Sequence, residues 1–261
     1  MKIAVTGKGG VGKTFIAGTL ATIYARKGRP VIAIDADSSP NLAISLGLSD
    51  EEAKHIIPVA ENEELIRLKT TTDHPGVFRL TFTVDDIISR YAVPTPSGAY
   101  LLVMGTVRAL GSGCACPANT VVKALLRHLL VERDEVVILD MEAGIEHLGR
   151  GTAEHVDTML VIADANKKSL ETARAICSMA AGSPIRQIGL VANKIIGPAE
   201  EEVFSAFARK HRLLVLGVIP FDQQVFTAGV TGEQLDEKTS VALGAISQLA
   251  QRLTDISIKA T

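Results

Sequence analysis

The chain has 261 residues, 29 acidic and 27 basic, so its formal net charge is −2. Apolar residues make up 47% of the chain, which is enough for a large core and excludes general disorder. The near-neutral charge, an aromatic content of 4% and the absence of Trp exclude an overall basic field or a base-stacking surface for nucleic acid.

Short, continuous runs of Val, Ile and Leu alternate with longer helical stretches. Such runs are typical of strands buried on both faces of a parallel sheet, and their alternation with helices implies right-handed βαβ crossovers. The sequence predicts strands at residues 2–6, 30–34, 77–82, 100–104, 135–139, 158–163, 187–192 and 213–218. It predicts helices at residues 12–27, 117–132, 168–181, 198–211 and 239–253.

This pattern predicts an α/β fold with a doubly wound, mostly parallel sheet and helices on both faces. We expect residues 1–261 to form a single domain. Residues 48–113 fit the alternation least, because they are more polar and contain four prolines. We interpret them as an elaborated insert leading to a Cys-x-Cys loop.

The N-terminal sequence contains no apolar signal segment, and the longest apolar run, residues 213–221, is too short to span a membrane. The three cysteines are too few for a disulfide framework and fit a reducing compartment. We therefore expect a cytoplasmic protein that binds neither nucleic acid nor membrane.

Residues 7–14, GKGGVGKT, satisfy the phosphate-loop pattern G-x-x-x-x-G-K-[ST] between a predicted strand and a predicted helix. The glycines let backbone N–H groups surround a phosphate, and the helix adds its positive end. Lys13 would bridge the β- and γ-phosphates of ATP, and the Thr14 hydroxyl would bind Mg²⁺. The predicted nucleotide-binding residues of this segment are Gly9, Gly10, Val11, Gly12, Lys13, Thr14 and Phe15.

Carboxylates follow two predicted strands. Asp35 and Asp37 lie two residues apart, so one could contact Mg²⁺ through water while the other orients the attacking water. They could equally cap the next helix. Asp140 ends an apolar run typical of a Walker B strand and would hold Mg²⁺ through water. Residues 140–146 are predicted to form switch II, with the backbone N–H of Gly144 facing the γ-phosphate.

Cys114 and Cys116 form a Cys-x-Cys pair between flanking glycines and Pro117. Two thiolates can chelate one soft or borderline metal, and two chains related by a twofold axis would complete a set of four sulfurs. Pro117 suits the first position of a helix, whose positive end favours thiolates. A redox pair and an inert pair remain alternatives. Cys177 lies among apolar helical residues and is interpreted as a packing residue.

The string from Lys8 to Thr14 resembles the deviant Walker A motif of the MinD/ParA/nitrogenase-iron-protein class of dimeric ATPases. The string from Asp140 to Thr152, DMEAGIEHLGRGT, resembles switch II of the CooC-type nickel-insertion ATPases. The phosphate loop, D-x-D, Cys-x-Cys and D-M-x-A-G-I-E-H motifs occur in the same order as in these proteins. The resemblance covers essentially the whole chain and is weakest in residues 48–113.

The resemblance implies roles for individual residues. Lys8 would reach across a nucleotide-sandwiched dimer to the partner's phosphates, and Asp37 would position the attacking water. Asn193, followed by Lys194 at the end of a predicted strand, would bind the purine, and the backbone near Pro220 would contact the base. Asn193 is not part of the guanine-specific N-K-x-D pattern, which favours ATP. A simple turn residue is the alternative for Asn193, and a solvated loop lysine for Lys8.

Two departures from that class are visible. Phe15 replaces the usual Ser or Thr, which removes a hydroxyl hydrogen bond to the α-phosphate while keeping the backbone N–H. The proline that often follows the second aspartate directly is displaced here to Pro40, and Ser38 takes its place.

The resemblance implies a homodimeric ATPase that binds Ni²⁺ or Zn²⁺ through Cys114 and Cys116 of two subunits. Its client would be carbon monoxide dehydrogenase or acetyl-CoA synthase, with ATP closing the dimer and hydrolysis reopening it. Two other functions compete with this one. A MinD/ParA-like positioning ATPase would need a basic surface or a basic amphipathic C-terminal helix. An iron–sulfur carrier ATPase would have widely spaced cysteines.

Overall fold

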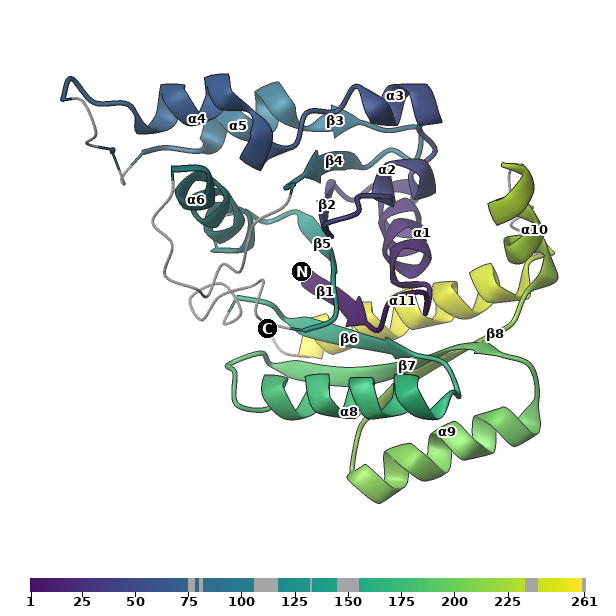
Figure 1. Cartoon of the computed structure of the whole chain (residues 1–261). Helices are drawn as coiled ribbons and strands as arrows, with labels where there is room; N and C mark the ends of the chain where they lie inside the picture. Colours follow the sequence, from purple (N-terminus) through teal and green to yellow (C-terminus); the bar gives the residue numbers. More distant parts are fainter. Residues whose placement is uncertain are drawn as a thin grey trace.

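The computed structural model describes residues 1–74, 78–79, 82–105, 117–131, 133–144, 155–232 and 239–259. Its strands are β1 (Lys2–Gly7), β2 (Val31–Ala36), β3 (Val93–Pro94), β4 (Tyr100–Val103), β5 (Val136–Met141), β6 (Thr158–Ala163), β7 (Gln187–Ile195) and β8 (Val215–Pro220). They form one sheet in the order β3-β4-β2-β5-β1-β6-β7-β8 (Figure 1). Every neighbouring pair is parallel except β3–β4. The predicted mostly parallel α/β fold is confirmed.

The helices of the described residues lie on both faces of this sheet. They are α1 (Lys13–Arg26), α2 (Leu42–Ser45), α3 (Asp50–Lys54), η1 (Val59–Glu61), α4 (Glu63–Thr70), α5 (Asp85–Tyr91), α6 (Pro117–Val131), α8 (Lys167–Ala180), α9 (Pro198–His211), α10 (Gln223–Thr231) and α11 (Val241–Lys259). Figure 1 shows α1 and α11 on one side of the sheet and α6 on the other.

Two hydrophobic clusters follow from the alternation of side chains along each strand. In β1, Ile3 and Val5 pack with α1 and α11, whereas Ala4 belongs to the cluster that contains α6, α8 and α9. All six residues of β1 are buried, which explains why its sequence is a continuous run without polar alternation.

Residues 48–113 contain α3, η1, α4, α5, β3 and β4 in their described part. The predicted strand at residues 77–82 is not a strand at its described positions. Phe78 forms an isolated antiparallel bridge with Thr71, and Arg79 donates its N–H to the Thr70 carbonyl. The other positions of that prediction, residues 77, 80 and 81, lie outside the described part of the chain.

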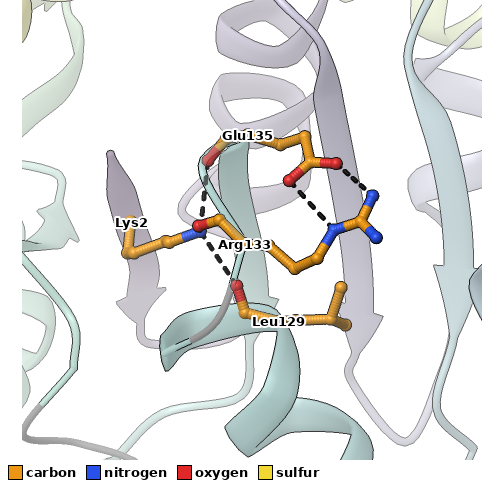
Figure 2. Close-up of polar contacts among 4 residues, drawn as sticks. All are labelled: Lys2, Leu129, Arg133 and Glu135. Atoms are coloured by element: carbon orange, nitrogen blue, oxygen red, sulfur yellow. Dashed lines mark hydrogen bonds and ion pairs between the residues drawn. The ribbon is translucent and has the colours of Figure 1, made fainter. Parts of the chain in front are cut away.

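The start of β1 is anchored to the far end of α6 by a buried lysine (Figure 2). The Lys2 side chain is 6% exposed. Its ammonium donates to the carbonyls of Leu129 at 2.9 Å, Arg133 at 2.6 Å and Glu135 at 3.2 Å. Leu129 lies in the last turn of α6, where carbonyl groups have no partner within the helix. Beside this cluster, the Arg133 guanidinium pairs with the Glu135 carboxylate. Burial lowers the pKa of Lys2.

No helix among the described residues combines the length and the apolar character needed to cross a membrane.

Candidate functional site

The connection from β1 to α1 is a tight loop built on glycines. Gly7 has φ +147°, and a Cβ there would lie 2.3 Å from the Ile162 carbonyl oxygen of the neighbouring strand β6. Gly12 has φ +94°, and its missing Cβ leaves space for the Asn193 amide, which a methyl group would approach to 2.5 Å. α1 begins immediately afterwards at Lys13, whose side chain is 7% exposed. The loop therefore has the close approaches and left-handed backbone that a phosphate cradle requires.

Two residues near the end of β7, Asn193 and Lys194, hydrogen-bond to backbone carbonyls of this loop. The Asn193 amide nitrogen donates to the Val11 carbonyl at 2.7 Å, in a buried bond. The Lys194 ammonium donates to the Gly10 carbonyl at 2.8 Å. Lys194 has φ +61°, a left-handed conformation that is uncommon for a residue with a side chain. Holding the carbonyls on the outside of the loop leaves the N–H groups to face a phosphate.

Asp140 is the next-to-last residue of β5, which is the strand beside β1. It pairs in register with Val5 of β1 and Asp35 of β2, so three strand ends meet here. Both carboxylate oxygens of Asp140 are buried, and neither has a hydrogen-bond partner among the described residues. Burial raises the pKa of Asp140 to about 7. Asp35 and Asp37 also raise it, whereas the Thr14 hydroxyl and the Lys13 ammonium lower it.

A buried carboxylate of this kind needs an external partner, and a divalent cation supplies one. The donor set of Asp140 and the Thr14 hydroxyl, with carboxylates nearby, fits Mg²⁺, which prefers oxygen ligands and keeps several waters.

Asp35 and Asp37 both accept backbone N–H groups from the loop after β2. Asp35 is fully buried and accepts the N–H of Leu42 at 2.8 Å and of Asp37 at 3.2 Å. Burial raises its pKa, and these hydrogen bonds lower it. Asp37 is half-buried and accepts the N–H of Ser39 at 2.9 Å. The capping interpretation therefore applies to Asp35, while Asp37 lies farther out along the loop.

Comparisons with known proteins agree with this geometry. The family described as the CobQ/CobB/MinD/ParA nucleotide binding domain matches residues 2–235. The chain belongs to this family. Its similarity to CooC, together with the family match, identifies the chain as a CooC-type deviant P-loop ATPase.

The chain is 43% identical over 234 residues to the carbon monoxide dehydrogenase accessory protein CooC of Rhodospirillum rubrum, covering 89% of this chain and 88% of that protein. It is 40% identical over 246 residues to an uncharacterised ATP-binding protein of Methanocaldococcus jannaschii, with 93% of each chain covered. Among solved structures, the MinC:MinD cell division complex of Aquifex aeolicus gives a TM-score of 0.69 at 21% identity. That match covers 98% of this chain and 96% of the MinD chain, and it shows the shared fold.

Two residues beside the phosphate loop, Thr6 and Glu142, make contacts that the sequence did not predict. The Thr6 hydroxyl donates to the Glu142 carbonyl at 2.6 Å and accepts the Gly144 N–H at 3.2 Å. The Gly144 N–H, expected to face a γ-phosphate, is thus held by Thr6 in this structure. The Glu142 carboxylate accepts the N–H of Ser38 at 3.0 Å. The available signal for Thr6 was a polar residue directly after the apolar run at residues 3–5 of β1.

The remaining predicted nucleotide-binding positions of the family lie around the same edge of the sheet. Lys8 is half-buried in the loop, and Phe15 packs partly buried against the cluster under α1. Pro220 ends β8. Asp222, just beyond it, accepts the N–H of Gln224, the hydroxyl of Ser240 and the N–H of Ala242. These three hydrogen bonds connect the starts of α10 and α11.

Cys114 and Cys116 lie outside the described residues, so the structure gives no geometry for them. α6 begins at Pro117, the next residue, as the sequence predicts. In the part of the chain that the structure describes, no three His, Cys, Asp or Glu side chains group as a metal site. Cys177 is buried in the core, where burial raises its thiol pKa to about 11, in agreement with a packing role.

Proposed function

We propose that this ATPase controls Ni²⁺ or Zn²⁺ held by Cys114 and Cys116 of two copies of the chain, and assists nickel insertion into carbon monoxide dehydrogenase or acetyl-CoA synthase. The observation that carries the proposal is the 43% identity to CooC across 89% of the chain. That relative is named as an accessory protein of carbon monoxide dehydrogenase. The likeness to MinD at 21% identity supports the fold alone and gives no argument for a positioning role.

The nucleotide site is proposed to work through residues that lie together at one sheet edge. Lys13 pairs with the phosphates of ATP, and backbone N–H groups of residues 9–15 surround them. Thr14 and Asp140 hold Mg²⁺, which neutralises phosphate charge when it is bound. Asp37 orients the attacking water, and Lys8 stabilises charge on the partner's nucleotide.

The adenine base is proposed to lie near Asn193, Lys194 and Pro220. The amide nitrogen of Asn193 already donates to Val11, so its part in base recognition falls to its carbonyl oxygen. The three residues come from the ends of the neighbouring strands β7 and β8, at the sheet edge where ligands of open α/β folds bind.

The cysteine pair is proposed to act as the metal-binding part of the same dimer. Two chains give four thiolates, the number that a tetrahedral Zn²⁺ site uses, and Ni²⁺ also accepts thiolate ligands. Rotation of two subunits changes the distance between their Cys-x-Cys pairs. Metal affinity would therefore follow the nucleotide state, and by linkage the metal would alter nucleotide affinity by the same factor.

Native mass and bound metal test this proposal on anaerobically reduced protein with Ni²⁺ and a non-hydrolysable ATP analogue. We expect one metal ion per two chains, lost in the Cys114→Ser/Cys116→Ser variant. Cys177→Ser is the matched control, because it removes a buried thiol that the proposal does not use, and it should keep the metal. Equal metal in the double variant, or equal metal affinity with ADP, with the analogue and without nucleotide, would contradict the proposal.

A further inference from the structure

The loop that follows β2 has its backbone N–H groups bound by carboxylates. The N–H groups of Asp37, Ser38, Ser39 and Leu42 donate to side chains of Asp35, Glu142, Asp37 and Asp35, respectively. Two of these three carboxylates belong to the loop or its own strand. Glu142 comes instead from the segment after β5, 104 residues farther along the chain.

Glu142 is itself fixed at its backbone. Its carbonyl accepts the hydroxyl of Thr6, which is fully buried in the central strand β1. The backbone of Glu142 is therefore bound to β1, while its side-chain carboxylate binds the loop after β2. It lies two residues after Asp140, which begins switch II, and its contact Ser38 is the residue directly after Asp37.

The identity of residue 38 makes this contact possible. In the class that the motifs resemble, a proline often follows the second aspartate directly, and proline has no N–H group. Here Ser38 occupies that position and the proline is displaced to Pro40. The N–H that Glu142 accepts exists because of this displacement.

We propose that Glu142 is a positioning residue that ties the Asp37 loop to switch II, so that both respond together to the nucleotide. The inference rests on the proposed role of Asp37 in hydrolysis. Glu142 fixes the backbone next to Asp37, and a misplaced water-orienting carboxylate slows the chemical step more than it weakens nucleotide binding. The link therefore affects kcat rather than KM.

Steady-state ATPase kinetics test the link with Glu142→Ala, Glu142→Gln and Ser38→Pro. Glu142→Ala removes one hydrogen bond to a charged group. We therefore expect it to lower kcat roughly fivefold to tenfold, with the KM for ATP changed less than about twofold. Glu142→Gln keeps an acceptor oxygen and should recover most of kcat. Ser38→Pro removes the donor, so it should match Glu142→Ala, and the double variant should be no slower than either single one.

Glu52→Ala is the matched control. The Glu52 carboxylate accepts the Ser49 N–H at 2.8 Å at the start of α3, so the same kind of bond is removed outside the nucleotide site. Its kcat should stay at the wild-type value. Equal kcat in Glu142→Ala and wild type, or independent and multiplying effects of Ser38→Pro and Glu142→Ala, would overturn the inference.

Hydrogen exchange of nucleotide-free protein separates this inference from the proposed function. We expect faster exchange of residues 37–42 in Glu142→Ala than in wild type and Glu52→Ala. A wild-type protein without ATPase activity would contradict the proposed function. The inference would then depend on the exchange measurement, and unchanged exchange at residues 37–42 in Glu142→Ala would overturn it.

Discussion

The amide nitrogen of Asn193 lies 2.7 Å from the carbonyl oxygen of Val11, although the two residues are 182 positions apart. The bond joins the end of β7 to the phosphate loop and uses the space left by the missing side chain of Gly12. The loop is thus held in shape by a strand that is not its neighbour, since β6 lies between β1 and β7.

Replacing Asn193 by Ala should weaken ATP binding roughly threefold to tenfold. The Val11 carbonyl would lose its hydrogen-bond donor, and the phosphate loop would lose the contact that supports it. Calorimetric titration with ATP and with tripolyphosphate measures this and separates two roles. A loop support weakens both ligands, whereas a base contact weakens only ATP. Asn62→Ala, which removes a side-chain cap at the start of α4, is the control and should leave both affinities unchanged. Wild-type affinity for tripolyphosphate in Asn193→Ala would contradict the supporting role.

Gly12→Ala should disrupt the loop, whereas Gly9→Ala should be tolerated. At Gly12 a methyl group meets the Asn193 amide and a left-handed backbone, while at Gly9 nothing lies within 4 Å. We expect Gly12→Ala to lower the free energy of unfolding by about 1–3 kcal/mol and to abolish measurable ATP binding. Denaturant unfolding and titration of the two variants provide the comparison. Equal free energies of unfolding and equal ATP affinities of the two variants would contradict a role for the close approach at Gly12.

Asp140→Asn should change how stability depends on pH in the metal-free protein. Burial raises the pKa of Asp140 in the folded state to about 7 from the ordinary aspartate value of 3.8, so between these values the folded state binds more protons than the unfolded state. The contribution of this carboxyl group to the free energy of unfolding is therefore greatest at low pH, and it is lost as pH rises from about 4 to about 7. Asparagine does not titrate, so it removes this loss. At pH 8 the free energy of unfolding of Asp140→Asn should therefore exceed that of wild type by up to about 4 kcal/mol.

The same comparison at pH 5 should show a smaller advantage of Asp140→Asn, since most of the wild-type carboxyl groups then keep their proton. Urea unfolding of both proteins in chelator at pH 5 and pH 8 measures the two differences. A constant difference between the proteins at both pH values would contradict the raised pKa.

Lys2→Met should destabilise the protein by about 2–4 kcal/mol, because three carbonyl groups lose a buried charged donor. Lys54→Met is the control. Lys54 pairs with Glu51 on the surface, with both side chains at least 69% exposed, and its loss should cost under about 0.5 kcal/mol. Urea unfolding measures both variants. A loss in Lys2→Met no larger than in Lys54→Met would contradict the anchoring role.

The sequence was most informative where local patterns determine structure. Continuous apolar runs predicted the central strands, and helix bounds such as 198–211 agree with α9 because Pro198 suits the first turn and basic residues end the helix. The predicted strand at residues 77–82 was wrong at its described positions, and the prediction missed the short helices α2, α3, α4, α5 and α10 and the two-residue strand β3. Short elements and edge pairs depend on packing rather than on periodicity.

The site followed the same division. The closeness of the phosphate loop, Asp35, Asp37 and Asp140 could be expected from the sequence, since each lies at or just beyond the C-terminal end of a buried strand and these ends meet at one edge of a parallel sheet. The contacts of Asn193 with Val11 and of Glu142 with Ser38 join segments far apart in the chain. No local pattern encodes them, because they arise only when the sheet order is fixed.

The Lys2 cluster also has a mechanical consequence for the opposite end of α6. An α-helix of this length, Pro117–Val131, extends over about 22 Å and is stiff compared with a loop. One end is pinned to the central strand of the sheet, and the other begins at the residue after Cys116. A small tilt of α6 about the Lys2 contacts would therefore move the start of the helix, at Pro117, farther than its end.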